Sequence, residues 1–133
     1  MRDGRKQIVK SLITALSGVG VTVFTKVPKD TTYPYIHISE IYQDEDGPKN
    51  SFFYNYDILI QVVYKDLDSK VNLWNTVNSI LGIIKNDASL TLTDDFEVME
   101  TTLISNSETE IMTDTGILDI GLIRILIKVE DKN

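Results

Sequence analysis

Hydrophobic residues alternate with more polar ones through residues 52–65, the longest run of strand-forming residues in the chain. Successive side chains of a strand point to opposite faces, so one face of this strand is uncharged and the other is mixed. The uncharged face carries Phe52, Tyr54, Tyr56, Ile58, Ile60, Val62 and Tyr64, and the mixed face includes Asn55, Asp57 and Gln61. The pattern predicts a strand that packs one side on a core and turns the other towards water or a partner. We expect the rest of the chain to be organised around it.

Two segments repeat apolar residues at helical spacing. Residues 3–16 predict an amphipathic helix, with Asp3 as its N-cap and Gly18 as the left-handed residue that ends it. Residues 70–86 predict a second helix that Asp68 or Ser69 caps and that lies against the sheet through a wide apolar stripe. The stripe comprises Val71, Trp74, Val77, Leu81 and Ile84, broadened by Leu73, Ile80 and Ile83. Because it lies on this stripe, Trp74 is expected in the core rather than at an interface.

Four further segments have the alternation or composition of strands, and they define the fold class. They are residues 21–27, 35–42, 96–111 and 118–130, with a polar loop at 43–50 and a turn at 114–116. The order of elements is therefore α-β-β-β-α-β-β. This order predicts a single α+β domain over residues 1–133, a mostly antiparallel sheet with two helices packed on one face.

Composition and charge narrow the classes of function. The chain has no cysteine, which excludes disulfides, thiolate zinc sites and thiol nucleophiles. Its net charge of −7 disfavours sequence-independent binding of nucleic acid. The densest basic cluster, Arg2, Arg5, Lys6 and Lys10, is interpreted as the solvated face of the first helix. No apolar run is long enough to cross a bilayer, and the charged N-terminus is unlike a signal peptide.

Three possible chemical sites have simpler explanations. Asp114-Thr115-Gly116 matches the triplet of retroviral-type aspartic proteases, but too little chain follows it, and the triplet is typical of a hairpin turn. Asp44 and Asp46 lack the ligand spacing of a calcium loop, which favours a solvated acidic loop. His37 is the only histidine and is expected to be a surface or packing residue. We therefore expect no enzyme activity, cofactor or metal.

Taken together, these segments resemble the tail-terminator and tail-completion proteins of long-tailed bacteriophages. The resemblance covers nearly the whole chain and lies in the order and character of the elements. A short N-terminal helix precedes a Val-rich strand, and a Tyr-Pro-Tyr-Ile-His-Ile strand (33–38) runs into a Gly-Pro loop. An aromatic strand (52–64) leads into a helix (70–84), and a Thr/Ser/Glu-rich strand, the turn at 114–116 and a closing strand complete the chain.

The resemblance implies a structural role in a virion. Such proteins form a hexameric ring on the head-proximal end of the tail tube, end tube growth and present a surface to the head connector. The implied partners are other copies of this chain, the tube protein and the connector or stopper protein, with assembly in the cytoplasm of the host bacterium. DNA would pass through the ring as cargo without specific binding, and an acidic lumen would repel its phosphates. We expect no membrane partner.

Acidic and polar residues are the candidates for assembly contacts. They fall on the polar loop, on the second hairpin and on the mixed face of the central strand: Asp44, Glu45, Asp46, Lys49, Glu108, Glu110, Asp114, Asn55, Asp57 and Gln61. Simple solvation of each is the alternative. The alternatives for the whole chain are a head–tail connector or stopper of the virion neck, a cellular protein-interaction module and, more distantly, a dimeric acid protease.

Overall fold

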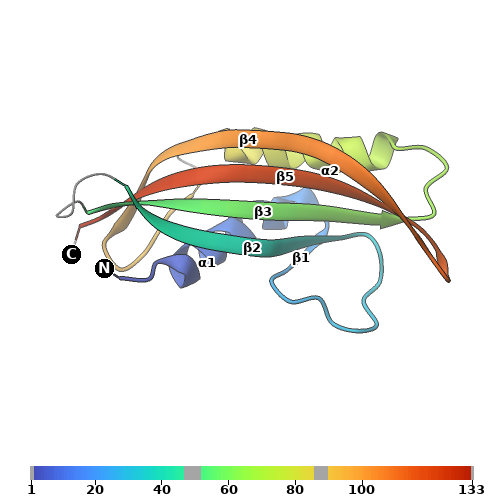
Figure 1. Ribbon diagram of the computed structural model, residues 1–133, viewed down its shortest axis with the longest axis horizontal. Helices are drawn as coiled ribbons and strands as arrows, with labels where there is room; N and C mark the ends of the chain where they lie inside the picture. The colour runs from blue at the N-terminus through green and yellow to red at the C-terminus, as the bar shows by residue number, and fades with distance from the viewer. Residues whose placement is uncertain (1, 47–51, 86–89, 133) are drawn as a thin grey trace.

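The structure is a computed structural model that describes residues 2–46, 52–85 and 90–132. Its helices and strands follow one another along the chain and have the α+β class (Figure 1). They are α1 (Arg5–Leu16), the short 3-10 helix η1 (Ser17–Val19), β1 (Thr22–Phe24), β2 (Tyr35–Asp46), β3 (Phe53–Lys65), α2 (Val71–Ile84), β4 (Phe96–Thr113) and β5 (Gly116–Asp131). The predicted fold class and the predicted order of helices and strands are confirmed.

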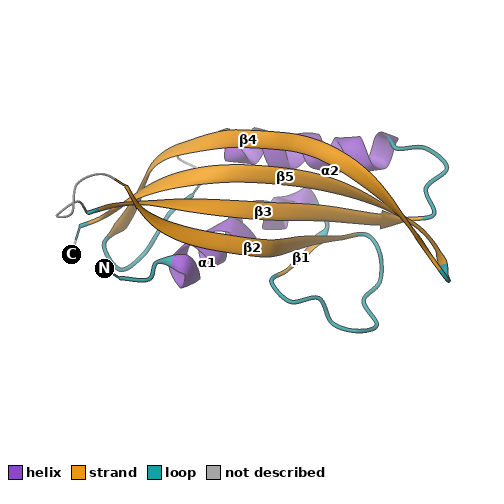
Figure 2. Cartoon of the chain, in the orientation of Figure 1, coloured by secondary structure: helices purple, strands orange, loops and turns teal. Residues whose placement is uncertain are grey.

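The five strands form one sheet in the order β1-β2-β3-β5-β4. β1 pairs with β2 in parallel, and every other neighbouring pair is antiparallel. Figure 2 shows both helices on the same side of the sheet. β3 lies in the middle, between β2 and β5, so the strand with the strongest sequence pattern is the centre of the sheet.

The core lies between the helices and one face of the sheet. β3 alternates as its sequence predicts, with Tyr54, Tyr56, Ile58, Ile60 and Val62 buried towards the helices. β5 supplies the neighbouring row, in which Ile58 pairs with Ile125 and Ile60 with Ile123. Burial of such side chains contributes roughly 1.5–3 kcal/mol each. Phe52 was predicted on this face, but it precedes β3 and is exposed.

On the face of the sheet opposite the helices, the described residues cover one end. There Tyr33, just before β2, packs on Tyr35 with 5.5 Å between ring centroids, and Lys65 Nζ lies 5.6 Å from the centre of the Tyr33 ring. Val63 and Ile120 are buried beneath this end. The remainder of this face, called the open face below, holds half-buried and exposed side chains.

The ends of α1 differ from the prediction. Gly4 rather than Asp3 is the N-cap residue, although the Asp3 carboxylate still accepts a hydrogen bond from the Arg5 backbone N–H at 3.0 Å. The helical segment continues through η1 and ends at Gly20, whose φ of 87° is left-handed. Glycine adopts this conformation without steric cost, and Gly20 takes the role predicted for Gly18.

The strand lengths differ from the prediction where pairing extends or shortens a strand. β1 has only three residues, because it pairs with β2 only from Tyr35 to His37. β2 continues through Asp46, so the loop predicted from residue 43 is wrong for residues 43–46. Their backbone pairs with the first part of β3, from Tyr56 back to Phe53. The rest of that loop lies outside the described residues.

The two ends of the chain are joined by polar contacts that are buried or partly buried. The Arg2 guanidinium donates to both oxygens of Asp131, at 2.5 and 2.9 Å, and lies 4.2 Å from the centre of the Phe96 ring. Asp131 is only 5% exposed. Next to this pair, the Gly4 N–H donates to the hydroxyl of the fully buried Tyr56 at 3.1 Å. These contacts fasten the N-terminus across the ends of the central strands.

The buried Tyr56 phenol predicts a loss of stability in alkali. Burial raises its pKa, and the hydrogen bond from Gly4 offsets this only in part. Below the unfolded pKa of about 10 the phenol is neutral in both states. As pH rises further the unfolded chain ionises first, so stability falls as pH rises through the folded pKa, by up to about 1.4 kcal/mol per pH unit.

Tyr56→Phe removes this titration, and we expect two effects in urea unfolding. At pH 8 the variant should be less stable by about 1–2 kcal/mol, because Gly4 N–H loses its partner. Between pH 10 and 11.5 its free energy of unfolding should fall less steeply than that of the wild type. The exposed Tyr42 is the control, since Tyr42→Phe should leave the stability at pH 8 unchanged. Parallel pH curves for Tyr56→Phe and wild type would contradict the prediction.

Candidate assembly interface

The open face of the sheet carries a charged cluster at its centre. Arg124 of β5 bonds Asp57 of β3 at 2.9 Å and Glu40 of β2 at 3.4 Å, and so joins three strands. Asn55 and Gln61 also lie on this face, as the alternation of β3 predicts. Their location is therefore confirmed, whereas a role in a subunit contact stays a prediction. The Asp57 carboxylate is already partnered within the chain.

β4 is the most exposed element of the sheet. It is an edge strand of 18 residues whose only hydrogen-bonded neighbour in the described part of the chain is β5. From Thr102 onwards every residue of β4 is exposed. Several of these exposed side chains, and one earlier in the strand, are large and apolar: Met99, Leu103, Ile104, Ile111 and Met112. An edge strand with free backbone groups and apolar side chains is a template for contact with another chain.

Two β-bulges mark β4. The register with β5 shifts between Val98 and Glu100 and again between Leu103 and Ser105. The residues left without a partner are Met99 and Ile104, which are 45% and 51% exposed. Bulges re-aim side chains and twist an edge away from regular pairing. Each bulge of this edge thus presents an apolar side chain.

The predicted acidic residues of the second hairpin do not lie together. Asp114 is in the tight turn between β4 and β5, where the Thr113 hydroxyl donates to the Gly116 carbonyl at 2.8 Å. Glu110 lies in β4 near this turn. Glu108 lies further back over α2, where its carboxylate accepts from Trp74 Nε1 at 3.3 Å and pairs with Lys70 Nζ at 3.6 Å. Glu108 thus connects α2 to the hairpin. Of the three predicted acids, only Asp114 lies at the tip of the hairpin.

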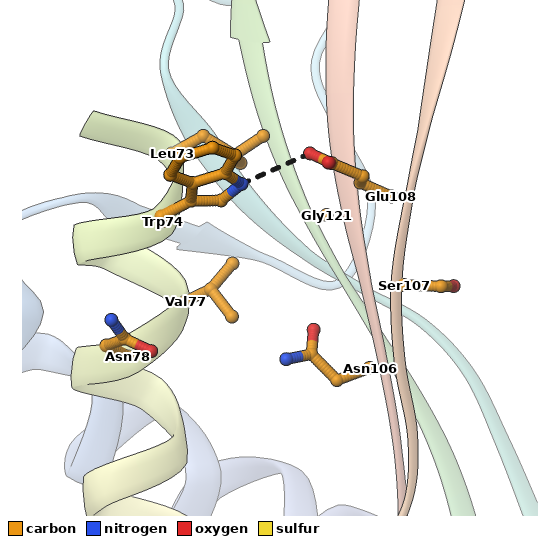
Figure 3. Close-up of a pocket in the computed structure, with 8 residues that line it drawn as sticks. All are labelled: Leu73, Trp74, Val77, Asn78, Asn106, Ser107, Glu108 and Gly121. Carbon is orange, nitrogen blue, oxygen red and sulfur yellow. Dashed lines mark hydrogen bonds between the residues drawn. The ribbon is translucent and has the colours of Figure 1, made fainter. Parts of the chain in front are cut away.

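A groove of about 370 Å³ separates α2 from the β4–β5 hairpin (Figure 3). Its floor is at Gly121, where a Cβ atom would lie 3.0 Å from Val77 Cγ2. Trp74 and Asn106 line the groove from opposite sides, and Ser107 points away from it. The absence of a side chain at Gly121 lets α2 approach the sheet closely.

Trp74 is 51% exposed, so its predicted place in the core is wrong. Val71 is exposed as well. The buried stripe of α2 is rotated from the predicted one and consists of Leu73, Thr76, Val77, Ile80 and Ile84. Thr76 is accommodated on this stripe because its hydroxyl lies 2.6 Å from the Tyr64 hydroxyl. The wide stripe in the sequence contains every buried residue of α2 except Thr76, and the position of the sheet selects which part of the stripe is buried.

The first acidic segment is part of the sheet. Asp44, Glu45 and Asp46 are in β2, where they pair with Asn55, Tyr54 and Phe53 in turn. The prediction that they lie in a solvated loop is therefore wrong for these residues. Their contact with another subunit stays a prediction. Lys49 lies outside the described residues.

The chemical alternatives are located as follows. Asp114-Thr115-Gly116 forms the predicted hairpin turn. His37 Nε2 lies 3.2 Å from the Thr25 carbonyl oxygen, at the join of β1 and β2. In the ranges that the structure describes, no three His, Cys, Asp or Glu side chains gather to hold a metal ion. No helix in those ranges is long and apolar enough to span a membrane.

The sequence interpretation missed Arg124 and the apolar side chains of β4. The alternation of β5 puts Arg124 on the face opposite Ile123 and Ile125, but nothing local indicates which acids lie across the sheet from it. The signal at Met99 and Ile104 is also weak, because each interrupts the alternation by one residue. Such an interruption is what a bulge produces.

These features define a class of protein: an α+β domain with a mostly antiparallel sheet, both helices on one face and a long exposed edge hairpin. No protein-family model matches the chain, and no curated protein matches it in sequence. Solved structures do match. A chain in the structure described as "Virion of native gene transfer agent (GTA) particle" superposes with a TM-score of 0.77 and 13% identity, over 98% of this chain and 99% of that chain. The two chains share one fold from end to end.

Proposed function

We propose that this chain is a structural protein of a phage-like virion, which forms a ring on the head-proximal end of the tail tube. The ring would end tube growth and join the tail to the head connector. The observation that carries the proposal is the fold shared with a chain of a gene transfer agent virion, over nearly the full length of both chains. The resemblance of the sequence to tail-terminator proteins points to the more specific role.

The surface of the domain supports a role in assembly. β4 presents apolar side chains along an unpaired edge, with Met112 81% exposed next to the hairpin tip. Exposed apolar side chains on an edge strand are a liability for a protein that acts alone. They are useful in a subunit whose edge is covered once it is assembled.

The proposed partners are other copies of this chain, the tube protein below the ring and the connector or stopper protein above it. DNA would pass through the ring as cargo. The net charge of −7 suits this passage, since acidic side chains that line a lumen repel phosphates. The protein would therefore be located in the virion, at the junction of tail and head.

Electron microscopy of lysates from a phage or prophage that lacks this gene tests the proposal. We expect filled heads beside unattached tails, some of them overlong because tube growth is not stopped. A plasmid that supplies the wild-type chain should restore joined particles. Filled heads that lose their DNA would instead indicate a connector or stopper. Normal infectious particles would overturn the virion proposal altogether.

A further inference from the structure

Charge is segregated between two distant segments of this chain. Residues 4–29 contain five Lys or Arg and no Asp or Glu. Residues 96–117 contain five Asp or Glu and no Lys or Arg. The first segment includes α1 and β1, and the second is β4 with the turn that follows it. Because β1 and β4 are the first and last strands of the sheet, the two charges are at opposite edges (Figure 1).

The basic edge consists of exposed positions on α1 and around β1. Lys6, Lys10 and Ile13 follow one another at helical spacing on the side of α1 away from its buried residues. Ile13 also lines a hollow of about 280 Å³ with Val21 and Val23. Lys26 and Lys29 are exposed on the segment after β1. We call Lys6, Lys10, Ile13, Val23, Lys26 and Lys29 the basic edge.

The acidic edge is β4 with the hairpin tip, and it presents side chains on both faces of the sheet, because Glu100 pairs with Lys128 of the open face and Glu110 with the buried Asp119 of the helix face. Glu100 and Glu110 are exposed there, as is Asp114 at the hairpin tip. Unlike Glu97 and Glu108, which pair with Lys132 and Lys70, these three acids form no ion pair among the described residues. Apolar side chains lie between them along the strand. We call Met99, Glu100, Ile104, Glu110, Ile111 and Asp114 the acidic edge.

The four lysines of the basic edge likewise form no ion pair within the part of the chain that the structure describes. Each edge therefore combines unpaired charge of one sign with apolar surface, and the two signs are opposite. Complementary charge steers association and fixes its register, while the apolar side chains supply buried area. One edge is suited to contact the other on a separate copy.

We propose that the chain associates head to tail, with the acidic edge of one copy against the basic edge of the next. The contact involves two different surfaces, so it continues from copy to copy and closes into a ring when the rotation allows. The inference deepens the proposed function, and it rests on that function only for the closure of a ring on a tail tube.

Two other edge contacts are disfavoured by the same charges. Two acidic edges against each other would bring like charges together. The free part of β2, beyond its pairing with β1, carries Asp44, which has the same sign as the acidic edge, whereas the nearby Glu40 is already paired with Arg124. Like charges directly opposite in a sheet are destabilising. The basic edge is the complementary choice.

Chemical cross-linking with a carbodiimide tests the contact, because this reagent joins only carboxyl and amine groups that touch. A mixture of unlabelled and ¹⁵N-labelled full-length chain is treated at low salt, and cross-links between copies are identified by mass spectrometry. We expect amides that join Glu100, Glu110 or Asp114 to Lys6, Lys10, Lys26 or Lys29. Cross-links confined to other surfaces, or none between copies, would overturn the proposal.

Charge reversal provides the matched control. Glu100→Lys with Glu110→Lys makes both edges basic, and Lys10→Glu with Lys26→Glu cancels the net charge of the basic edge. All four positions are exposed, so folding should not change. Each variant alone should lose at least about tenfold of the cross-linked fraction, and an equal mixture of the two should regain it. If either variant associates like wild type, or if the mixture regains nothing, the proposal is wrong.

These outcomes are separable from those of the gene deletion. Normal association of the reversed variants, beside unattached tails in the deletion lysate, would overturn the head-to-tail contact and leave the proposed function standing. If the mixture of variants recovers association but the deletion strain makes normal particles, the head-to-tail contact would stand and the proposed function would be overturned.

Discussion

A chain that carries both Met99→Ser and Ile104→Ser is expected to fold normally and to lose most of its association with other copies. The two side chains are at the bulges of β4 and are about half exposed in the single chain. If the contact buries these two side chains, their removal weakens the free energy of association by roughly 2–4 kcal/mol. This corresponds to about a 30- to 1,000-fold higher dissociation constant. Serine is uncharged, so the charges of the acidic edge are unchanged.

Sedimentation velocity over a range of concentrations measures this loss, and urea unfolding checks the fold. The control is Tyr42→Ser with Phe52→Ser, which removes as much exposed apolar surface, at 58% and 60% exposure, from residues outside both proposed edges. Its association should match the wild type. Equal weakening by the two double variants would show that general surface hydrophobicity, rather than the β4 edge, drives association.

The largest loss of stability is expected from Ile58→Ala. Ile58 is fully buried at the centre of the sheet, where it pairs with the equally buried Ile125. Removing such a side chain leaves a cavity, and the cost is about 2–5 kcal/mol. The total stability of a domain is only about 5–15 kcal/mol, so this one substitution uses a large share of it.

The neighbouring residue on the same strand is the matched control. Leu59 is half-buried on the open face, and Leu59→Ala should lower the free energy of unfolding by about 1 kcal/mol. Urea unfolding at a low protein concentration compares the two variants without interference from association. Equal losses would contradict the assignment of the two faces, since they would mean that the open face is packed as tightly as the core.

The sequence determined the strands and the faces of its most regular segments. The alternation in β3 and β5 has the period of a strand, and burial follows that period except where a neighbouring segment also covers the other face, as at Val63 and Ile120. The same reasoning identified the helices, the element order and the face that holds Asn55, Asp57 and Gln61. These are local properties, because the residues that define each pattern lie within one element.

The ends of elements were predicted less well, because they depend on a partner. β2 reaches Asp46 because β3 offers backbone groups to pair with, although residues 43–46 have the composition of a loop. The stripe of α2 could be buried around Trp74 or around Val77, and the sheet selected Val77. In both cases the local sequence allows two outcomes. The free energy of the tertiary contacts, strand pairing for β2 and packing on the sheet for α2, decides between them.

Only the tertiary structure decided which distant residues form the candidate interface. Strand order places β5 between β3 and β4, which leaves β4 at an edge with its apolar side chains exposed. Arg124 bonds residues 67 and 84 positions away, and Arg2 bonds Asp131 across 129 positions. Periodicity carries no information about such pairs, because it describes one element at a time. The charges of the two edges can be read from the sequence, but their separation to opposite edges is a property of the folded sheet.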